Sequence, residues 1–194
     1  DIPGTTRDSI DSIVKYYGEE ILLSDTAGLR KRSQVKENVE MYSIMRTARA
    51  IERCDVAVIM LDAVRGLEEQ DKKIINQVDE NRKGMLIAVN KWDLVEKDHK
   101  TADIFVKDFY SALKTYDYLP ILFISAKSKQ RITKVLEYSK QIKLRRETRI
   151  STSKLNQTIL PELEKTPPPS VQGRDLRLNY ITQVKTEQIG RAHV

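Results

Sequence analysis

Three short runs of apolar residues constrain the fold of this chain more than any other feature. They are VAVIML at 56–61, MLIAVN at 85–90 and ILFISA at 121–126. Each run is apolar throughout, which is typical of strands buried on both faces of a parallel sheet. The intervals between and after them predict helices over 68–81, 102–114 and 133–147. Alternating strands and helices indicate an α/β fold, doubly wound around a mostly parallel sheet.

The segments on either side of this pattern predict further elements. Residues 9–25 indicate a β-hairpin that turns at Gly18–Glu19 and offers Ile10, Ile13, Ile21 and Leu23 to a core. An apolar residue recurs at helical spacing over 39–51, which predicts a helix. After the basic stretch 140–149, the sequence predicts a short helix broken or bent near Pro161 and a half-buried strand over 175–184. These last elements indicate part of a second module.

Composition limits the compartment and the partners. The 34 Lys and Arg residues outnumber the 28 Asp and Glu residues, and the net charge of +6 suits an anionic partner. A single cysteine, Cys54, excludes an intrachain disulfide and favours a reducing compartment. No segment approaches the ~18 consecutive apolar residues of a membrane span. We therefore expect a cytoplasmic protein with no membrane partner. We also expect it to be a monomer.

Polar side chains follow the second apolar run. Guanine needs an acceptor for its N1 and N2 hydrogens and a donor for O6 and N7. Asp93 can accept both N–H groups, Asn90 can donate toward N7, and the aliphatic stem of Lys91 can cover the ring face. The tetrapeptide NKWD by itself is a weak signal, because the same residues also suit a polar turn after a strand.

Three further motifs strengthen the nucleotide interpretation. In DTAG, Asp25 can hold Mg²⁺ through water and Gly28 allows a γ-phosphate to approach the backbone. SAK at 125–127 follows a predicted strand and can present a backbone N–H to the guanine oxygen. PGTTRD at 3–8 offers threonine hydroxyls of the kind that ligate magnesium. The four motifs occur in the order used by nucleotide switch proteins.

The motifs GTTRD, DTAGL, NKWD and SAK resemble those of GTPases related to Ras, Era and TrmE. The segments DTAGLRKRSQV, YSIMRTARAI, GLEEQDKKI and AVNKWDLV resemble the second GTPase domain of the Der (EngA) double-GTPase family. NQTILPELEKTPPP and LRLNYITQV resemble the first helix and a strand of the KH-like domain that follows in that family. No G-x-x-G loop is present, so RNA clamping of the KH type has no independent support from the sequence.

The resemblance implies a set of site residues. Thr6, with Thr5 as second choice, would coordinate Mg²⁺ and sense the γ-phosphate, and Asp25 would hold the same ion through water. The residues implied to bind GTP are Asp25, Thr26, Ala27, Gly28, Leu29, Asn90, Lys91, Trp92, Asp93, Ser125, Ala126 and Lys127.

The residue that orients water is implied to be missing. Ras-like proteins place a glutamine just after the DTAG glycine, whereas Leu29 has no group that could orient or deprotonate water. No catalytic side chain is therefore identified. The resemblance implies a K⁺ ion in place of an arginine finger. The basic residues at 30–32 could contribute, although a solvated loop explains them equally well.

The family also needs a G-x-x-x-x-G-K-[ST] phosphate loop, and none of the seven glycines begins one. We expect it to lie upstream of Asp1, so that the chain is a fragment that binds GTP poorly and leaves sheet backbone unpaired. The expected domains are a GTPase domain over 1–148 and a partial KH-like domain over 149–187. Residues 188–194 resemble nothing in the family and could be an artefact.

The resemblance implies a GTPase that hydrolyses GTP to GDP and phosphate and acts in assembly of the large ribosomal subunit, with that subunit and its RNA as partners. One alternative is an Era- or TrmE-type GTPase in other RNA maturation, which the tail segment disfavours. Another is a nucleotide-free fragment that binds RNA or protein. The absent phosphate loop favours that reading, and the intact NKWD and DTAG motifs disfavour it.

Overall fold

The computed structural model describes residues 11–24, 45, 47–96, 98–166, 180–185 and 188–193. The chain divides into two units, Asp1–Ile142 and Lys143–Val194, each held together by its own internal contacts.

A parallel sheet forms the centre of the first unit. Its strands are β3 (Val56–Asp62), β4 (Gly84–Asn90) and β5 (Ile121–Phe123), in the order β3-β4-β5. Leu61 lies opposite Val89, which in turn lies opposite Phe123. The three predicted strands are confirmed, but β5 is shorter than the apolar run suggested. It ends at Phe123 because the chain turns after Ile124, and Ser125 pairs with Gln130 in an isolated antiparallel bridge.

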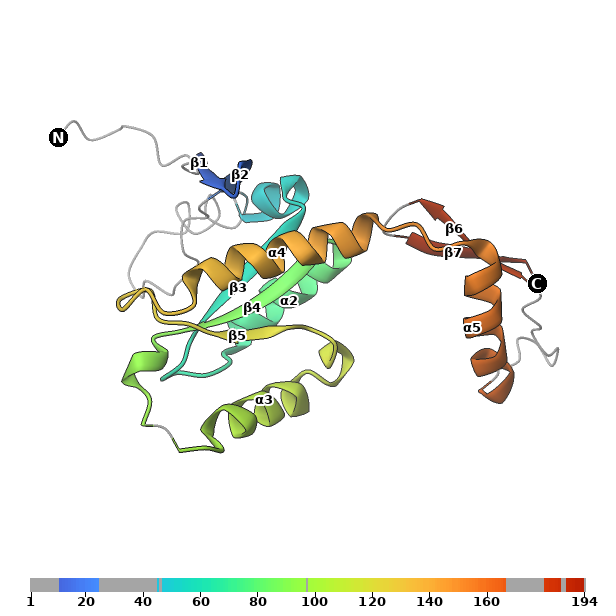
Figure 1. The fold of residues 1–194 in the computed structure, drawn as a ribbon. Helices are drawn as coiled ribbons and strands as arrows, with labels where there is room; N and C mark the ends of the chain where they lie inside the picture. Colours follow the sequence, from blue (N-terminus) through green and yellow to red (C-terminus); the bar gives the residue numbers. More distant parts are fainter. Residues whose placement is uncertain are drawn as a thin grey trace. The chain divides into compact units, whose positions relative to one another are not determined.

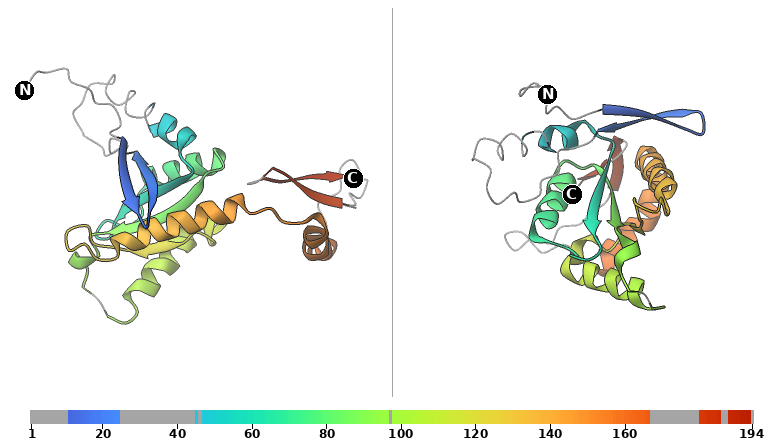
Figure 2. Two further views of the ribbon diagram at one scale, coloured as in Figure 1. Left: turned by 45° about the horizontal axis from the view of Figure 1, so that its top comes forward. Right: turned by 90° about the vertical axis from the view of Figure 1, so that its left-hand side faces the viewer.

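Three of the predicted helices are confirmed with only small differences at their ends. They are α2 (Glu69–Glu80), α3 (Thr101–Ala112) and α4 (Ile132–Glu147). At the start of α2 the Asp71 carboxylate accepts the backbone N–H of Glu68 at 2.9 Å, which satisfies a donor that the helix leaves unpaired. The 3₁₀ turns η1 (Trp92–Leu94) and η2 (Lys114–Tyr116) flank α3. Helices α2 and α4 lie on opposite faces of the sheet, as a doubly wound fold requires (Figures 1 and 2).

The main core lies between the sheet and the helices α2 and α3. Alternate residues of the strands point into it, because side chains in a strand alternate between the two faces. Burying each such side chain stabilises the fold by about 1.5–3 kcal/mol. Its central members are Ile59, Leu61, Ile75, Val78, Ile87, Val89, Phe109 and Phe123.

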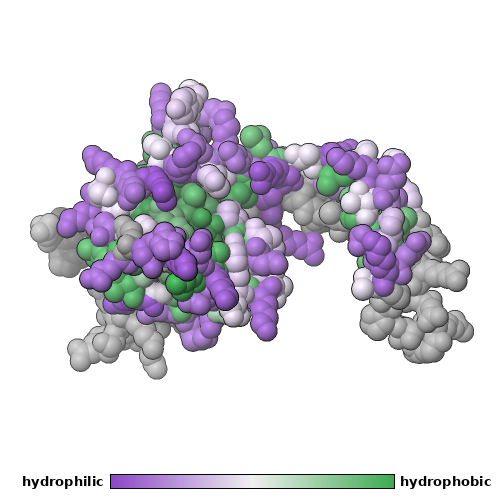
Figure 3. All heavy atoms as spheres, turned by 60° about the horizontal axis from the view of Figure 1, so that its bottom comes forward, coloured by the Kyte–Doolittle hydropathy of each residue, from purple (hydrophilic) through white to green (hydrophobic). Residues whose placement is uncertain are grey.

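Strand β3 is an edge strand in the described part of the sheet. It pairs with β4 on one side, and no described strand pairs with its other side. Val58 and Met60 on its second face are 39% and 58% exposed, although Ile59 and Leu61, which alternate with them, are buried. On the face drawn in Figure 3, hydrophobic residues gather near the middle of the larger coloured region, with hydrophilic residues around them.

The predicted hairpin is confirmed as the antiparallel strands β1 (Asp11–Tyr16) and β2 (Glu19–Ser24). Its turn is formed by Tyr17 and Gly18, one residue earlier than predicted, and both have positive φ. The expected burial is wrong for Ile13 and Leu23, which are 64% and 42% exposed. Two polar side-chain contacts join this hairpin to α4: Tyr16 Oη donates to Glu137 at 3.1 Å and Lys140 Nζ lies 2.7 Å from Glu19.

The second unit contains the helix α5 (Thr152–Lys165) and the antiparallel strands β6 (Tyr180–Lys185) and β7 (Gln188–His193). The sequence predicted a break or bend near Pro161, but α5 runs through Pro161 to Lys165, so the predicted break is wrong. The Ser151 hydroxyl caps the helix by accepting the Lys154 N–H. Residues 188–193, for which the sequence suggested only an unrecognised tail, form β7.

Candidate functional site

Polar residues gather where the parallel strands end. Asp62 and Asn90 are the last residues of β3 and β4 and lie opposite each other in the register. The Ala63 N–H donates to the Asn90 carbonyl at 2.9 Å, which continues the pairing beyond the strands. Ser125 follows β5 at the same edge. Carboxyl ends of parallel strands are where ligands bind in open α/β sheets, so this edge is the candidate site.

Asn90 joins two of the predicted base-reading loops. Its side-chain oxygen accepts the backbone N–H of Ala126 at 2.9 Å, and its amide nitrogen lies 3.6 Å from the Met60 sulfur. A second link runs from the Trp92 N–H to the Ile124 carbonyl at 3.1 Å. The sequence predicted that a backbone N–H of the SAK segment would face the guanine oxygen. In this structure the Ala126 N–H is used by Asn90.

Lys91 adopts a left-handed backbone conformation, with φ of 62°. Such a conformation strains a residue with a Cβ and persists where the surroundings hold it. Its ammonium lies 2.7 Å from the Asp62 carboxylate, and the other oxygen of that carboxylate accepts the Val64 N–H at 3.0 Å. The hydrogen bond from Lys91 lowers the pKa of the Asp62 carboxyl below its ordinary value.

The side chains of Trp92 and Asp93 point to different environments. Trp92 is 7% exposed and packs on Phe123, with ring centroids 4.1 Å apart, and on Phe105 at 6.1 Å. Its indole is therefore part of the core and anchors the loop. It can affect base binding only indirectly, through the positions of Lys91 and Asp93. Asp93, one residue later in η1, is exposed to solvent.

The SAK segment is a tight turn. Ser125 is fully buried, and its backbone exchanges hydrogen bonds with Gln130 at 3.2 and 3.0 Å. The Ser125 hydroxyl accepts the Ser128 N–H at 3.1 Å. Ala126 and Lys127 are exposed at the turn, on the side where Asn90 holds it. Ser125 thus fixes the shape of the turn, and its two neighbours remain accessible.

The structure brings together the two base-reading motifs but does not describe the others. Thr5 and Thr6 lie outside the described residues, as do Asp25, Thr26, Ala27, Gly28 and Leu29. Strand β2 ends at Ser24, immediately before Asp25. Within the described ranges, no group of three His, Cys, Asp or Glu side chains could hold a metal ion.

Asp62 is a polar residue of this edge that the sequence analysis did not single out. Its position offered a signal, because it ends an apolar run just as Asn90 ends the next one. The partner of its carboxylate, however, comes from a strand end 29 residues away in the sequence.

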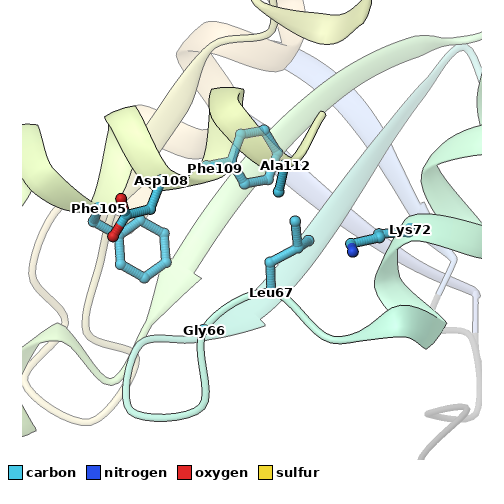
Figure 4. Close-up of a pocket in the computed structure, with 7 residues that line it drawn as sticks. All are labelled: Gly66, Leu67, Lys72, Phe105, Asp108, Phe109 and Ala112. Carbon is cyan, nitrogen blue, oxygen red and sulfur yellow. The ribbon is translucent and has the colours of Figure 1, made fainter. Parts of the chain in front are cut away.

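A pocket of about 280 Å³ lies elsewhere in the first unit. Figure 4 shows Phe105, Asp108 and Phe109 of α3 on one side of it, with Leu67 and Lys72 on the other. None of the residues that line it is a predicted site residue. The pocket is therefore separate from the base-reading loops.

Comparison with known proteins identifies relatives of both parts of the chain. A family described as "50S ribosome-binding GTPase" matches residues 1–91, and the "KH-domain-like of EngA bacterial GTPase enzymes, C-terminal" matches residues 149–190. The chain is 50% identical to GTPase Der of Chloroherpeton thalassium and 48% identical to that of Chlorobaculum tepidum, each over 96% of the chain. It spans 43% of the length of each of these relatives.

Solved structures share the fold. A structure titled as Era in complex with MgGDPNP and nucleotides 1506–1542 of 16S ribosomal RNA is 22% identical, with a TM-score of 0.58. That match covers 70% of this chain and 44% of the Era chain. A probable GTP-binding protein engB is 19% identical, with a TM-score of 0.52, over 72% of this chain and 85% of the other. The predicted α/β fold is confirmed, and these GTP-binding proteins share it.

Proposed function

The chain belongs to the Der (EngA) family of GTPases, and on that premise we propose that it binds guanine nucleotides and hydrolyses GTP to GDP and phosphate. The observation that carries this proposal is the hydrogen bond between Asn90 and Ala126. It holds the NKWD and SAK loops together at the carboxyl edge of the sheet, where Asp93 is exposed and able to accept the guanine N1 and N2 hydrogens.

The proposal assigns phosphate and metal binding to residues outside the described part. Thr6 and Asp25 would hold Mg²⁺, and Gly28 would contact the γ-phosphate. Bound Mg²⁺ neutralises charge on the phosphate oxygens. A K⁺ ion would add positive charge near the phosphates, because Leu29 offers no polar group. The other residues that we propose to bind GTP are Thr26 and Ala27, which precede Gly28, and Lys127 of the SAK loop.

We place the activity in assembly of the large ribosomal subunit, in the cytoplasm, with the chain acting as a monomer. The description of the family that matches residues 1–91 supports a ribosomal partner, and the net charge of +6 suits ribosomal RNA. We assign residues 1–148 to the GTPase domain and 149–187 to part of a KH-like domain. The match over 149–190 supports a boundary near residue 148, and the pairing of β7 with β6 favours extending the second domain past 187. Among the described residues, no helix is long and apolar enough to cross a bilayer.

Titration of Mg-GDP into the chain tests nucleotide binding. The sole tryptophan, Trp92, lies between Lys91 and Asp93 in the sequence, so we expect its fluorescence to respond to changes in this loop when nucleotide binds. A second protein would carry, before Asp1, the segment that precedes the matched region in the Chloroherpeton thalassium relative. We expect tighter binding by this chimera, since phosphate contacts dominate affinity in this class. If neither protein binds, the chain is a nucleotide-free binding module instead.

Replacement of Asp93 by Asn tests base recognition in the same titration. Xanthine carries a carbonyl oxygen where guanine carries the 2-amino group, so an amide donor suits it and a carboxylate repels it. We expect Asp93→Asn to weaken GDP binding at least tenfold and to strengthen binding of xanthosine diphosphate, because each correct or lost pair changes ΔG by about 1–3 kcal/mol. Asp103→Asn, an exposed change in α3, serves as the matched control. Unchanged GDP affinity in Asp93→Asn would contradict the assignment of Asp93.

A further inference from the structure

We propose that Asp62 is a positioning residue of the guanine site, whose carboxylate fixes the Lys91 ammonium so that the aliphatic stem of Lys91 lies where it covers one face of the base. This inference rests on the proposed guanine binding and extends it. None of the relatives' names and no motif of the sequence assigns a role to Asp62.

The register of the parallel strands β3 and β4 brings Asp62 close to Lys91. Asp62 lies opposite Asn90, so its side chain is close to the residue that follows Asn90. The Lys91 ammonium lies 2.7 Å from one carboxylate oxygen of Asp62. The left-handed backbone of Lys91 turns the chain out of β4 at this point, and it determines where the lysine stem starts.

Asp62 is itself held rigidly. Its second carboxylate oxygen accepts the Val64 N–H at 3.0 Å, and its backbone carbonyl accepts the N–H groups of Arg65 and Gly66 at 3.1 and 2.9 Å. The positive φ of Gly66, 72°, closes this turn. A carboxylate fixed from both sides can hold a flexible lysine in a single place.

The contact differs from the ion pairs that lie within one helix. Lys72–Glu69 and Lys165–Glu162 join residues three apart on one helix, and their carboxylates are 83% and 69% exposed. Such pairs contribute little, because water screens them. The Asp62 side chain, by contrast, is only 10% exposed. Its partner comes from another strand. Water screens a partly buried pair of this kind less than an exposed one.

This geometry gives Lys91 a defined task. Its charge is directed to Asp62, so the part of the side chain left for the ligand is the four-carbon stem, which is apolar. A lysine ordered before the ligand arrives loses less conformational freedom on binding. Asp62 therefore raises affinity for any purine of the right shape, whereas Asp93 decides between guanine and other bases.

The test measures Mg-GDP and Mg-IDP binding by Trp92 fluorescence, in the chain or in the chimera described above, whichever binds. The variants are Asp62→Asn, Lys91→Met and the double variant. Glu69→Gln, which removes the exposed partner of Lys72, is the matched control. Hypoxanthine lacks the 2-amino group, so the ratio of the two dissociation constants reports on Asp93 alone.

We expect Asp62→Asn to weaken GDP and IDP binding by the same factor, about five- to tenfold, because ordering one long side chain is worth about that much. Glu69→Gln should change neither. In the Lys91→Met background the Asp62 substitution should have no further effect on affinity, since Asp62 acts through Lys91.

Three outcomes overturn the proposal. Wild-type affinity in Asp62→Asn, with or without a lower melting temperature, would leave Asp62 a structural residue and leave the proposed function intact. A changed GDP-to-IDP ratio would mean that Asp62 acts on Asp93 rather than on Lys91. If neither the chain nor the chimera binds GDP, the proposed function fails and this inference fails with it.

Discussion

A side-chain hydrogen bond helps to hold the two base-reading loops together. The Asn90 side chain accepts the Ala126 N–H at 2.9 Å. An oxygen acceptor is all that this contact requires, so an aspartate can replace the asparagine and an alanine cannot. The two substitutions therefore separate the structural role of Asn90 from any contact that its amide nitrogen makes with a base.

Hydrogen exchange of the Ala126 amide checks this role. We expect Asn90→Ala to speed its exchange and to lower the free energy of unfolding by about 1 kcal/mol, the typical net value of one hydrogen bond. Asn90→Asp should leave the Ala126 amide protected. Equal exchange rates in both variants would mean that Asn90 does not hold the loop.

Asp62 should make stability depend on pH at the acid end. Its pKa is lowered in the folded chain, chiefly by the hydrogen bond from Lys91, below the ordinary value of 3.8. A lowered pKa contributes stability that is fully present above the ordinary value and is lost as the pH falls through the folded value.

Denaturant unfolding followed by Trp92 fluorescence between about pH 6 and pH 3 measures this effect. We expect the loss of stability below about pH 4 to be smaller in Asp62→Asn than in the wild type. Exposed Glu69 and Asp98 also have lowered pKa values, so part of the acid loss should remain. Parallel curves for the two proteins would exclude a contribution from Asp62.

Helix α5 shows how a local rule is overridden. Pro161 has no N–H, so the carbonyl of Gln157 lacks its helical partner, and proline inside a helix costs about 3 kcal/mol. The helix nevertheless continues, with Leu155 buried and Asn156 bonded to β6. Tertiary contacts of this kind hold a helix that its own sequence would interrupt.

Pro161→Ala should stabilise α5, because the new N–H can donate to the Gln157 carbonyl and the ring is removed. We expect the free energy of unfolding followed by far-UV circular dichroism to rise by about 1–3 kcal/mol. Thr158→Ala, an exposed change in the same helix, should alter it by only a few tenths of a kcal/mol. No gain in Pro161→Ala would mean that the ring itself makes favourable contacts.

Strands and helices were predicted correctly where their apolar residues recur at the period of the element and are buried in the core. β3, β4 and α2 to α4 follow their apolar patterns closely. Ile13 and Leu23 of the hairpin β1–β2 are exposed. An alternating pattern places apolar side chains on one face of a strand, but it does not determine whether another element packs against that face. Strand β5 is shorter than predicted because the residues after Phe123 lead into a turn and do not continue the pairing with β4.

At the scale of the molecule, the chain divides within α4, after Ile142. Trp92 lies in the first unit. In the second unit, Asn156 joins α5 to β6: it accepts the Ile181 N–H at 2.8 Å and donates to the Ile181 carbonyl at 2.9 Å. Ile181 is 7% exposed, so water cannot easily replace these bonds. Trp92 fluorescence therefore follows unfolding of the first unit, and substitution of Asn156 perturbs the second unit.

Asn156→Ala should destabilise the second unit alone. Each buried group left without a partner costs about 1–3 kcal/mol. We expect the denaturant midpoint of part of the circular dichroism signal to fall while the Trp92 transition stays in place. Lys154→Ala, an exposed change in the same helix, controls for loss of a side chain. Equal shifts of both signals would indicate that the chain unfolds as one cooperative body.

The sequence by itself determined the fold class, the order of most elements and the motifs that bear on nucleotide chemistry, because burial periodicity and strand-end polar residues are local properties. Asn90, Lys91 and Asp93 were identified in this way. Only the tertiary structure paired Lys91 with Asp62, engaged the Ala126 N–H with Asn90 and turned Trp92 into the core. Those contacts join strand ends that lie 29 and 36 residues apart, and their partners are chosen by strand register and packing, which no local pattern encodes.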